Sequence, residues 1–344
     1  MRAAELISPL TFRLTDMPIE DPGPGEVQVR IEAVGVCGSD LHSYSEGGVG
    51  TTPNVYPMVL GHEPAGRIVK TGVGVTGFDV GDRGALEPAL YCYHCEFCLS
   101  GHHNVCSNIR FLSNPHHPGF FRELINLPVV NFLPIPAGIS FDEATLAEPL
   151  AIALHSIRLA SIQPGETVAV IGAGPIGLLT IAALQAAKAA RIWAVEPLAH
   201  RRELARGIGA DVVVEPGEAV EEILNGTRQR GVDCAIDCAA GEHTTGQAIE
   251  ITRNAGRIAL TGIHSSPFVS LDGSAMRRKE LTIFNVRRSN HETKEALDLL
   301  QEHAGWFAPL LTHTRDLEQI EEAFAIASQY RDGVGKMIVR PARS

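Results

Sequence analysis

The sequence has little positive charge, and what it has is scattered. It holds 29 Lys and Arg residues against 40 Asp and Glu residues, a formal net charge of −11. Basic residues occur in short groups, such as Arg287-Arg288, and the run Arg277-Arg278-Lys279 is no longer than three. An acidic chain without a basic stripe suits neither nucleic acid nor an anionic membrane surface. We therefore expect neither kind of partner.

We also expect no segment that directs the protein into a membrane or out of the cell. Residues 1–5 lead straight into polar, mixed sequence, without the apolar core of a signal peptide. The uncharged stretch from Thr167 to Gln185 has the length of a membrane span, but three glycines and a proline interrupt it. Charged residues make up only 20% of the chain and apolar residues 44%, which indicates a folded protein. We expect a globular protein of the cytoplasm.

The length of 344 residues exceeds one typical core and indicates two domains. The first half is rich in β-branched residues, glycine and proline. Residues 27–34 alternate as a strand does, and residues 77–83 form a turn cluster. We expect a mostly-β domain over residues 1–152.

The pattern changes near Phe141, with helical periodicity from Asp142 to Leu159 apart from Pro149. Short apolar runs then alternate with helical stretches, which indicates a parallel sheet covered by helices. The expected strands are 168–171, 192–195, 212–214, 232–237, 257–261 and 281–285, and the expected helices include 176–187 and 201–208. The fold class is thus α/β, with a doubly wound domain over 153–288. Residues 289–344 end in a further strand, and we expect them to return to the first domain.

A glycine-rich motif opens the second domain. Gly172-Ala173-Gly174-Pro175-Ile176-Gly177 is a G-x-G-x-x-G between an expected strand and an expected helix. Its glycines permit a tight turn, close approach of a pyrophosphate and close packing of helix on strand, and the helix N-terminus offers free amides. The alternative is a glycine-rich turn without a ligand. The position favours a dinucleotide site.

Glu196 ends the second expected strand, 19 residues after Gly177. A carboxylate there can bind both ribose hydroxyls and repels a 2′-phosphate, so it favours NAD over NADP. Arg201 and Arg202 are the opposing signal, since an arginine can accept that phosphate. We predict NAD.

Four of the seven cysteines crowd into one loop with the spacing Cys92-x2-Cys95-x2-Cys98-x7-Cys106. Four thiolates can surround one Zn²⁺ and leave no open position, so such a site stabilises a loop and performs no chemistry. Two disulfides or four free thiols are the alternatives. In a reducing compartment this spacing favours a structural zinc.

A second group of candidate ligands is dispersed along the first domain. Its polar residues are Cys37, Ser39, Asp40, His42, His62, Glu63 and Glu148. A catalytic zinc needs about three protein ligands and an open position, and Cys, His and Glu are suitable donors. Spacing alone leaves this group only suggestive.

Gly61-His62-Glu63-x2-Gly66-x5-Gly72-x2-Val75 resembles the signature of zinc-containing alcohol dehydrogenases in the medium-chain dehydrogenase/reductase superfamily. The segment from Cys37 to His42 resembles the first-ligand segment of that family, and the four-cysteine loop resembles its structural-zinc lobe. The resemblance implies a GroES-like catalytic domain, a Rossmann-type cofactor domain, two zinc ions per chain and NAD.

Within the superfamily the chain is most similar to the sorbitol (polyol) dehydrogenase branch. Glu148 stands where alcohol dehydrogenases of the best-known type have a third cysteine ligand, and Glu87-Pro88 and Val286-Arg287 also resemble polyol dehydrogenases. The resemblance implies a substrate pocket with Tyr44, Glu148, Arg287 and Arg288. Ser43 and Arg288 depart from the usual residues of that branch, so the identity of the substrate stays open.

The resemblance implies Cys37 and His62 as zinc ligands. Neighbouring side chains on extended backbone point apart, so Glu63 needs a kink to join His62. We predict Glu63 as a ligand, with Glu148 exchanging between metal and water. The zinc lowers the pKa of the substrate alcohol, Ser39 and His42 carry its proton to solvent, and a hydride passes to the nicotinamide. The predicted cofactor contacts are Gly172, Gly174, Pro175, Ile176, Gly177, Glu196, Arg201, Thr261, Gly262, Ile263, Asn285, Val286 and Arg287.

The sequence therefore predicts oxidation of a secondary alcohol, a polyol or sugar alcohol, to a ketone. One alternative is a threonine-type amino-alcohol dehydrogenase. Another, from a different class, is a catalytically silent zinc-binding relative, which would lack ligands or relay residues that this chain has. The resemblance also implies a homo-oligomer, a tetramer or a dimer.

Overall fold

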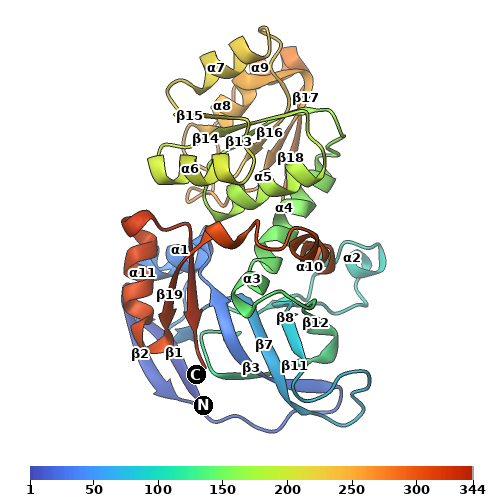
Figure 1. The fold of residues 1–344 in the computed structure, drawn as a ribbon, viewed down its shortest axis with the longest axis vertical. Coiled ribbons are helices and arrows are strands. Elements are labelled where there is room, and N and C mark those ends of the chain that lie inside the picture. The colour runs from blue at the N-terminus through green and yellow to red at the C-terminus, as the bar shows by residue number, and fades with distance from the viewer. Residues whose placement is uncertain (343–344) are drawn as a thin grey trace. The chain divides into compact units, whose positions relative to one another are not determined.

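The structure is a computed structural model that describes residues 1–342 (Figure 1). It divides into two compact units. Unit 1 contains residues 1–148 and 293–344, and unit 2 contains residues 149–292. The sequence-based boundaries were 152/153 and 288/289, so each boundary lies close to the structural one. The units are described separately.

Unit 1 is built on a seven-stranded sheet with the order β12-β8-β7-β3-β20-β19, in which β11 also pairs with β3. Strand β3 is central in this sheet because it pairs with β7, β11 and β20, and most of its residues are buried. The strands are β3 (Glu26–Gly35), β7 (Glu63–Thr71), β8 (Arg83–Leu86), β11 (Leu124–Pro128), β12 (Phe132–Pro134), β19 (Leu311–Asp316) and β20 (Lys336–Arg340).

The last strand of the chain pairs with a strand from its beginning. Strand β20 lies between β3 and β19, antiparallel to β3 and parallel to β19. Residues of β20 therefore belong to the same core as residues of β3, more than 300 positions earlier. This pairing brings the last strand to the region of the candidate metal ligands.

Shorter strands and helices surround the sheet of unit 1. The strands are β1 (Arg2–Ser8), β2 (Thr11–Asp16), β4 (Gly48–Val49), β5 (Thr52–Pro53), β6 (Met58–Val59), β9 (Ala89–Leu90) and β10 (Arg110–Phe111). The helices are α1 (Gly38–Glu46), α2 (Glu96–Leu99), α3 (Phe141–Ala144), α10 (Thr293–Glu302) and α11 (Ile320–Ser328). Short 3-10 turns are η1 (His103–Val105), η2 (Val129–Asn131), η3 (Ala308–Leu310), η4 (Leu317–Gln319) and η5 (Arg331–Gly333).

Unit 2 is a six-stranded parallel sheet with the order β15-β14-β13-β16-β17-β18. Numbered within the unit, this is the 3-2-1-4-5-6 order of the Rossmann fold. The strands are β13 (Thr167–Ile171), β14 (Arg191–Val195), β15 (Val212–Val214), β16 (Val232–Asp237), β17 (Thr252–Leu260) and β18 (Thr282–Asn285). The helices are α4 (Ala147–Leu159), α5 (Pro175–Ala186), α6 (Ala199–Gly207), α7 (Ala219–Gly226), α8 (Thr244–Ile251) and α9 (Gly273–Lys279). The predicted α/β class is confirmed.

The predicted elements of unit 2 agree with the structure except at two places. Strand β17 starts at Thr252 and not at Arg257, because helix α8 runs directly into it. The helical stretch from Asp142 to Leu159 is two helices, α3 and α4. Pro149 lies in the first turn of α4, where the missing N–H of proline costs no hydrogen bond.

No helix in the described part of the chain combines the length and the apolar character that a membrane span requires.

Candidate metal centres and cofactor site

Unit 1 brings three of the dispersed candidates together. The ligand atoms of Cys37, His62 and Glu63 all lie within 4.8 Å of one another, close enough for one ion to reach all three. Cys37 is the N-cap of α1, and Glu63 is the first residue of β7. The kink that lets both His62 and Glu63 face the ion is at Gly61, whose φ of 92° favours glycine. Glu148 is not part of this group of three.

Asp40 holds the backbone and the imidazole ring of this group in place. Its carboxylate accepts hydrogen bonds from the backbone N–H groups of Cys37 and Gly61, each at 3.1 Å, and Oδ1 lies 3.4 Å from His62 Nδ1. A carboxylate on one ring nitrogen of a histidine directs the other nitrogen to a metal. Asp40 is 1% exposed, and its contact with His62 suits a residue that orients a metal ligand.

The electrostatics of the group favour a cation. Burial lowers the pKa of His62, but the charges of Asp40 and Cys37 outweigh it and hold that pKa well above the usual value. Burial raises the pKa of Glu148 to about 8, and Glu148 Oε2 has no hydrogen-bond partner among the described residues. Glu63 Oε1 likewise has none. Unpartnered buried carboxylate oxygens beside a thiol and an imidazole are what a zinc site requires, so the residues present fit the ion.

Ser39 and His42, the predicted proton relay, lie on α1. Ser39 Oγ is 3.4 Å from His62 Nε2, at the metal group. His42 Nδ1 is 2.8 Å from Glu46 Oε1, and its side chain is 30% exposed. In the described part of the chain the two are not hydrogen-bonded to each other. A proton that passes between them needs a bridging hydroxyl group or water molecule.

Tyr44, predicted to line the substrate pocket, lies in the hydrophobic core of unit 1. It is 4% exposed, and its ring contacts those of Phe12 and Phe324 at centroid distances of 5.6 and 5.1 Å. On α1 it points away from the face that carries Ser39. This placement gives Tyr44 a packing role, and we do not retain it among the proposed substrate contacts.

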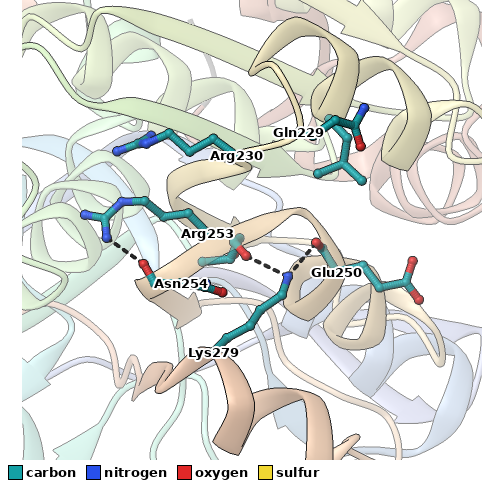
Figure 2. Close-up of a pocket in the computed structure, with 8 residues that line it drawn as sticks. Gln229, Arg230, Glu250, Arg253, Asn254 and Lys279 are labelled. Carbon is teal, nitrogen blue, oxygen red and sulfur yellow. Dashed lines mark hydrogen bonds between the residues drawn. The ribbon is translucent and has the colours of Figure 1, made fainter.

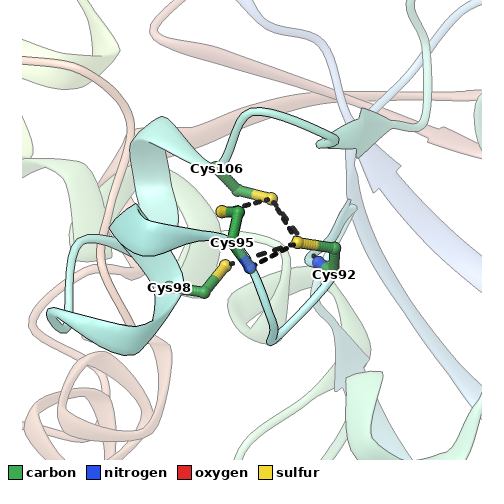
Figure 3. A group of neighbouring side chains, drawn as sticks. All are labelled: Cys92, Cys95, Cys98 and Cys106. Atoms are coloured by element: carbon green, nitrogen blue, oxygen red, sulfur yellow. Dashed lines mark hydrogen bonds between the residues drawn. The ribbon is translucent and has the colours of Figure 1, made fainter.

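The four-cysteine loop closes on itself (Figure 3). The sulfur atoms of Cys92 and Cys106 are 3.4 Å apart, and the pairs Cys92–Cys98 and Cys95–Cys106 are each 3.9 Å apart. These distances exclude disulfide bonds, and tetrahedral Zn–S bonds of about 2.3 Å give sulfur separations of about 3.8 Å. The ligand atoms of all four cysteines lie within 4.8 Å of one another. The loop therefore fits one structural zinc.

The glycine-rich turn of unit 2 has the geometry of a dinucleotide site. Gly172 has a φ of 89°, and Gly174 is the N-cap of α5, with Pro175 as its first residue. A Cβ at Gly177 would lie 1.8 Å from the carbonyl oxygen of Gly172, so no side chain fits there. Ile176 continues the first turn of α5. The turn leaves the helix N-terminus open to a phosphate.

Glu196 is fixed beside this turn. Its Oε2 accepts from Ala173 N at 2.7 Å and its Oε1 accepts from Leu198 N at 2.9 Å, so each oxygen keeps a lone pair for a ribose hydroxyl. Arg202 is committed elsewhere: it donates to the carbonyl oxygens of Glu196 and Pro197 and forms an ion pair with Glu215 at 2.7 Å. Arg201 lies next to the turn, because its Nη1 would be 3.6 Å from a Cβ placed on Gly174.

The other predicted cofactor contacts follow the carboxyl ends of β17 and β18, the edge where such sheets bind ligands. Thr261 Oγ1 donates to Ser156 Oγ at 3.0 Å, and a Cβ at Gly262 would lie 2.8 Å from Ala240 Cβ. Ile263 is 50% exposed. Asn285 ends β18, and Val286, Arg287 and Arg288 follow it, with Arg288 at a φ of 54°.

A separate pocket of about 480 Å³ lies in unit 2, near the amino ends of β16 and β17 (Figure 2). Its cationic groups already have partners. Lys279 Nζ donates to the carbonyl oxygens of Ile249, Glu250 and Thr252, each at 2.8 Å, and Arg253 bonds Asp233. We assign this pocket no ligand.

Two buried residues near these sites were not predicted. Lys336 contacts Glu63 in unit 1, and Asp237 in unit 2 accepts hydrogen bonds from Ala239 N and Ala240 N at the end of β16. Asp237 carried a signal, since it is a carboxylate at the end of an expected strand. Lys336 carried none, because a lysine at the start of a strand is ordinarily exposed.

Comparison with known proteins agrees with this geometry. Residues 23–137 match the alcohol dehydrogenase GroES-like domain family, and residues 175–302 match the zinc-binding dehydrogenase family. The chain is 33% identical over 345 residues to a sorbitol dehydrogenase of Bacillus subtilis, covering 100% of this chain and 98% of that one.

Solved structures show the same similarity. A zinc-binding dehydrogenase from Sinorhizobium meliloti bound to NADP has a TM-score of 0.91 at 28% identity, with 99% of each chain covered. An alcohol dehydrogenase from Escherichia coli complexed with NADH has a TM-score of 0.90 at 29% identity, again with 99% of each chain covered.

The metal group on a GroES-like unit and the Rossmann-type sheet define a zinc-dependent dehydrogenase that acts on alcohol groups with a nicotinamide cofactor. The chain belongs to the medium-chain dehydrogenase/reductase superfamily and, within it, to the polyol dehydrogenase branch. The predicted family is confirmed.

Proposed function

We propose that this protein oxidises a secondary alcohol of a polyol or sugar alcohol to a ketone with NAD⁺. The carrying observation is the group of Cys37, His62 and Glu63, whose ligand atoms lie within 4.8 Å of one another. The similarity to a sorbitol dehydrogenase over the whole chain supports a polyol as substrate. No residue observation favours the threonine-type alternative.

We propose two zinc ions per chain, one held by Cys37, His62 and Glu63 and one by the four cysteines of the loop. The first supplies Lewis-acid chemistry that lowers the pKa of the substrate hydroxyl. Ser39, at 3.4 Å from His62, accepts the released proton, and His42 passes it to solvent through a bridging group. Glu148 binds the substrate hydroxyl region or a water molecule through its unpartnered Oε2. Arg287 and Arg288 contact further substrate hydroxyls or the cofactor pyrophosphate.

We propose NAD as the cofactor. Glu196 is held at the glycine-rich turn by two backbone amides, where it accepts from the ribose hydroxyls and repels a 2′-phosphate. Arg202, one of the two arginines that could bind that phosphate, is paired with Glu215. This arrangement supports NAD, although a similar protein was crystallised with NADP.

We propose that the protein is cytoplasmic and forms a dimer or a tetramer. Four thiols poised for one ion require reducing conditions, and β18 is an unpaired edge of the unit 2 sheet. Light scattering on a size-exclusion column measures the assembly. A monomer at micromolar concentration contradicts the proposal.

The function is tested by a panel of sorbitol, xylitol, galactitol, inositols and L-threonine, with NAD⁺ and NADP⁺ in parallel and reduced cofactor measured by absorbance. We expect the highest kcat/KM with one of the polyols and NAD⁺, together with two zinc ions per chain by elemental analysis. The highest efficiency with L-threonine supports the amino-alcohol alternative.

Two further outcomes overturn the proposal. Turnover of no alcohol by protein that holds both zinc ions indicates a catalytically silent relative. A higher efficiency with NADP⁺ than with NAD⁺ removes the assignment of Glu196.

A further inference from the structure

Lys336 is a charged residue in the core of unit 1. It is 2% exposed at the first position of β20, although lysine is almost never fully buried without a partner. Its Nζ donates to the carbonyl oxygen of Val36 at 3.0 Å and forms an ion pair with Glu63 Oε2. The Glu63 side chain is itself only 1% exposed. The two charges therefore meet inside the protein, at a residue of the proposed metal group.

The neighbouring strand is shaped to admit this pair. Gly35, the last residue of β3, lies opposite Glu63 of β7 on one side and opposite Ile338 of β20 on the other. A Cβ at Gly35 would lie 2.1 Å from Glu63 Oε2 and 2.8 Å from Lys336 Cε. The φ of Gly35 is not in the left-handed region, so backbone conformation does not require glycine here. Glycine is required because a side chain at this position would occupy the space of the ion pair.

The ion pair with Lys336 engages one of the two oxygens of Glu63. Oε2 faces Lys336, whereas Oε1 has no hydrogen-bond partner among the described residues. The carboxylate also belongs to the group with Cys37 and His62. An ammonium group held on one carboxylate oxygen leaves a single oxygen for a metal ion and fixes its direction. Partners of this kind commonly alter metal affinity 10–100-fold when removed.

We propose that Lys336 is a positioning residue for the catalytic metal, and that Gly35 makes room for it. Lys336 restricts Glu63 to ligation through one oxygen, which keeps one position of the ion open for the substrate hydroxyl. This inference rests on the proposed function, since it takes Glu63 as a ligand. It assigns the ligand role to Glu63 in preference to Glu148.

The test compares Lys336→Met and Gly35→Ala with the wild-type protein. Gly35→Ala keeps every charge and displaces the ion pair, so it separates geometry from charge. Lys70→Met is the matched control, because Lys70 forms an exposed ion pair with Asp21 in the same unit. The zinc of the four-cysteine loop serves as an internal reference in each variant.

The first readout is competition with a chelator. We expect the catalytic zinc to bind about 10–100-fold more weakly in both variants, while the loop zinc and the control are unchanged. The second readout is visible absorption after Co²⁺ replaces the catalytic zinc. A Glu63 carboxylate that binds through both oxygens raises the coordination number, and Co²⁺ bands weaken as coordination rises above four. Lys336→Arg should restore much of the wild-type spectrum.

Lys336→Met leaves Glu63 unpaired in the core and can prevent folding. In that case the test uses Gly35→Ala and the double variant Lys336→Met/Glu63→Gln, which removes both charges. We expect the double variant to fold and to lose the catalytic zinc. Wild-type zinc affinity and an unchanged Co²⁺ spectrum in Gly35→Ala, with the ion pair displaced, overturn the inference, and the same results in Lys336→Met overturn it wherever that variant folds. Wild-type protein that holds only the loop zinc instead overturns the proposed function.

Discussion

Cys37 is the residue at which we test the proposed catalytic zinc most directly. It supplies the only thiol of the group with His62 and Glu63, and its backbone N–H is fixed by Asp40 at 3.1 Å. A serine hydroxyl at this position is a poor zinc ligand, while the fold of α1 has no reason to change. A substitution at Cys37 should therefore remove the metal ion and the activity without destabilising the fold.

We predict that Cys37→Ser loses one of two zinc ions per chain and at least about 1,000-fold in kcat, because a lost Lewis acid removes several kcal/mol of transition-state stabilisation. Elemental analysis and initial rates measure both effects. Cys95→Ser is the complementary variant, which should lose the loop zinc and keep the catalytic one. Full zinc content in Cys37→Ser contradicts the assignment.

Glu196 is the residue that we propose selects NAD over NADP. We predict that Glu196→Ala lowers the ratio of kcat/KM for NAD⁺ over NADP⁺ by about 10-fold or more, because charged hydrogen bonds contribute about 1.5–3 kcal/mol. Glu203→Ala is the control, since Glu203 is exposed and pairs with Arg206 on α6. If the ratio of kcat/KM for NAD⁺ over NADP⁺ stays at the wild-type value, Glu196 does not select the cofactor. Its role is then limited to the hydrogen bond that it accepts from Ala173 N in the turn.

At the scale of elements, Asp233 ties three strands of unit 2 together. In β16, it accepts from Thr167 N and Thr167 Oγ1 of β13, at 2.9 and 2.8 Å, and forms ion pairs with Arg230 and with Arg253 of β17. Although burial opposes it, hydrogen bonds from Arg230, Thr167 and Arg253 hold the pKa of Asp233 well below 3.8. The carboxylate is therefore more acidic in the folded chain than in the unfolded one.

We predict that Asp233→Asn lowers the free energy of unfolding by about 1–2 kcal/mol at neutral pH, because it weakens the hydrogen bonds and ion pairs of two partly exposed arginines. A depressed folded-state pKa adds stability above the unfolded value of 3.8, and that stability is lost as the pH falls below it. The difference between wild type and variant should shrink below that pH. Denaturant melts over a pH series measure it, with the exposed Asp298→Asn as control; a difference that is constant with pH rejects the linkage.

At the scale of the whole molecule, unit 1 is assembled from the two ends of the chain. Strand β20 lies inside the seven-stranded sheet, with β3 on one side and β19 on the other. Its residues Met337, Ile338 and Val339 are all at most 2% exposed. The sheet therefore cannot close before the last strand has been synthesised.

We predict that a chain ending at Gly335 does not fold its first unit, because the loss of β20 exposes the core beside β3 and removes Lys336 from Glu63. Soluble yield and zinc content measure this outcome. Arg340→Ala is the control, because Arg340 forms a partly exposed ion pair with Asp142 whose loss should cost less than about 1 kcal/mol. A soluble truncated chain with both zinc ions contradicts the prediction.

Local pattern was sufficient for much of this protein. The strands of unit 2 and the glycine-rich turn have short-range causes, namely apolar runs and glycine geometry, and β15 and β16 match their predicted bounds. Tyr44 and Lys336 could not be predicted in this way. Tyr44 follows the candidate ligand segment 37–42 along the chain, but its ring packs against Phe324 of α11. Lys336 begins a strand, where a lysine is ordinarily exposed, but it forms an ion pair with the buried Glu63.

The sequence by itself determined the types of donor atom, the cysteine spacing, the position of Glu196 and the family, because these depend on residue identity over short distances. Only the tertiary structure decided which donors meet. Sheet pairing sets Gly35 between Glu63 and Lys336, the turn at Gly61 directs His62 and Glu63 to one point, and Glu148 stays outside that group. The physical reason is that contacts between β3, β7 and β20 depend on the register of strands far apart in the chain.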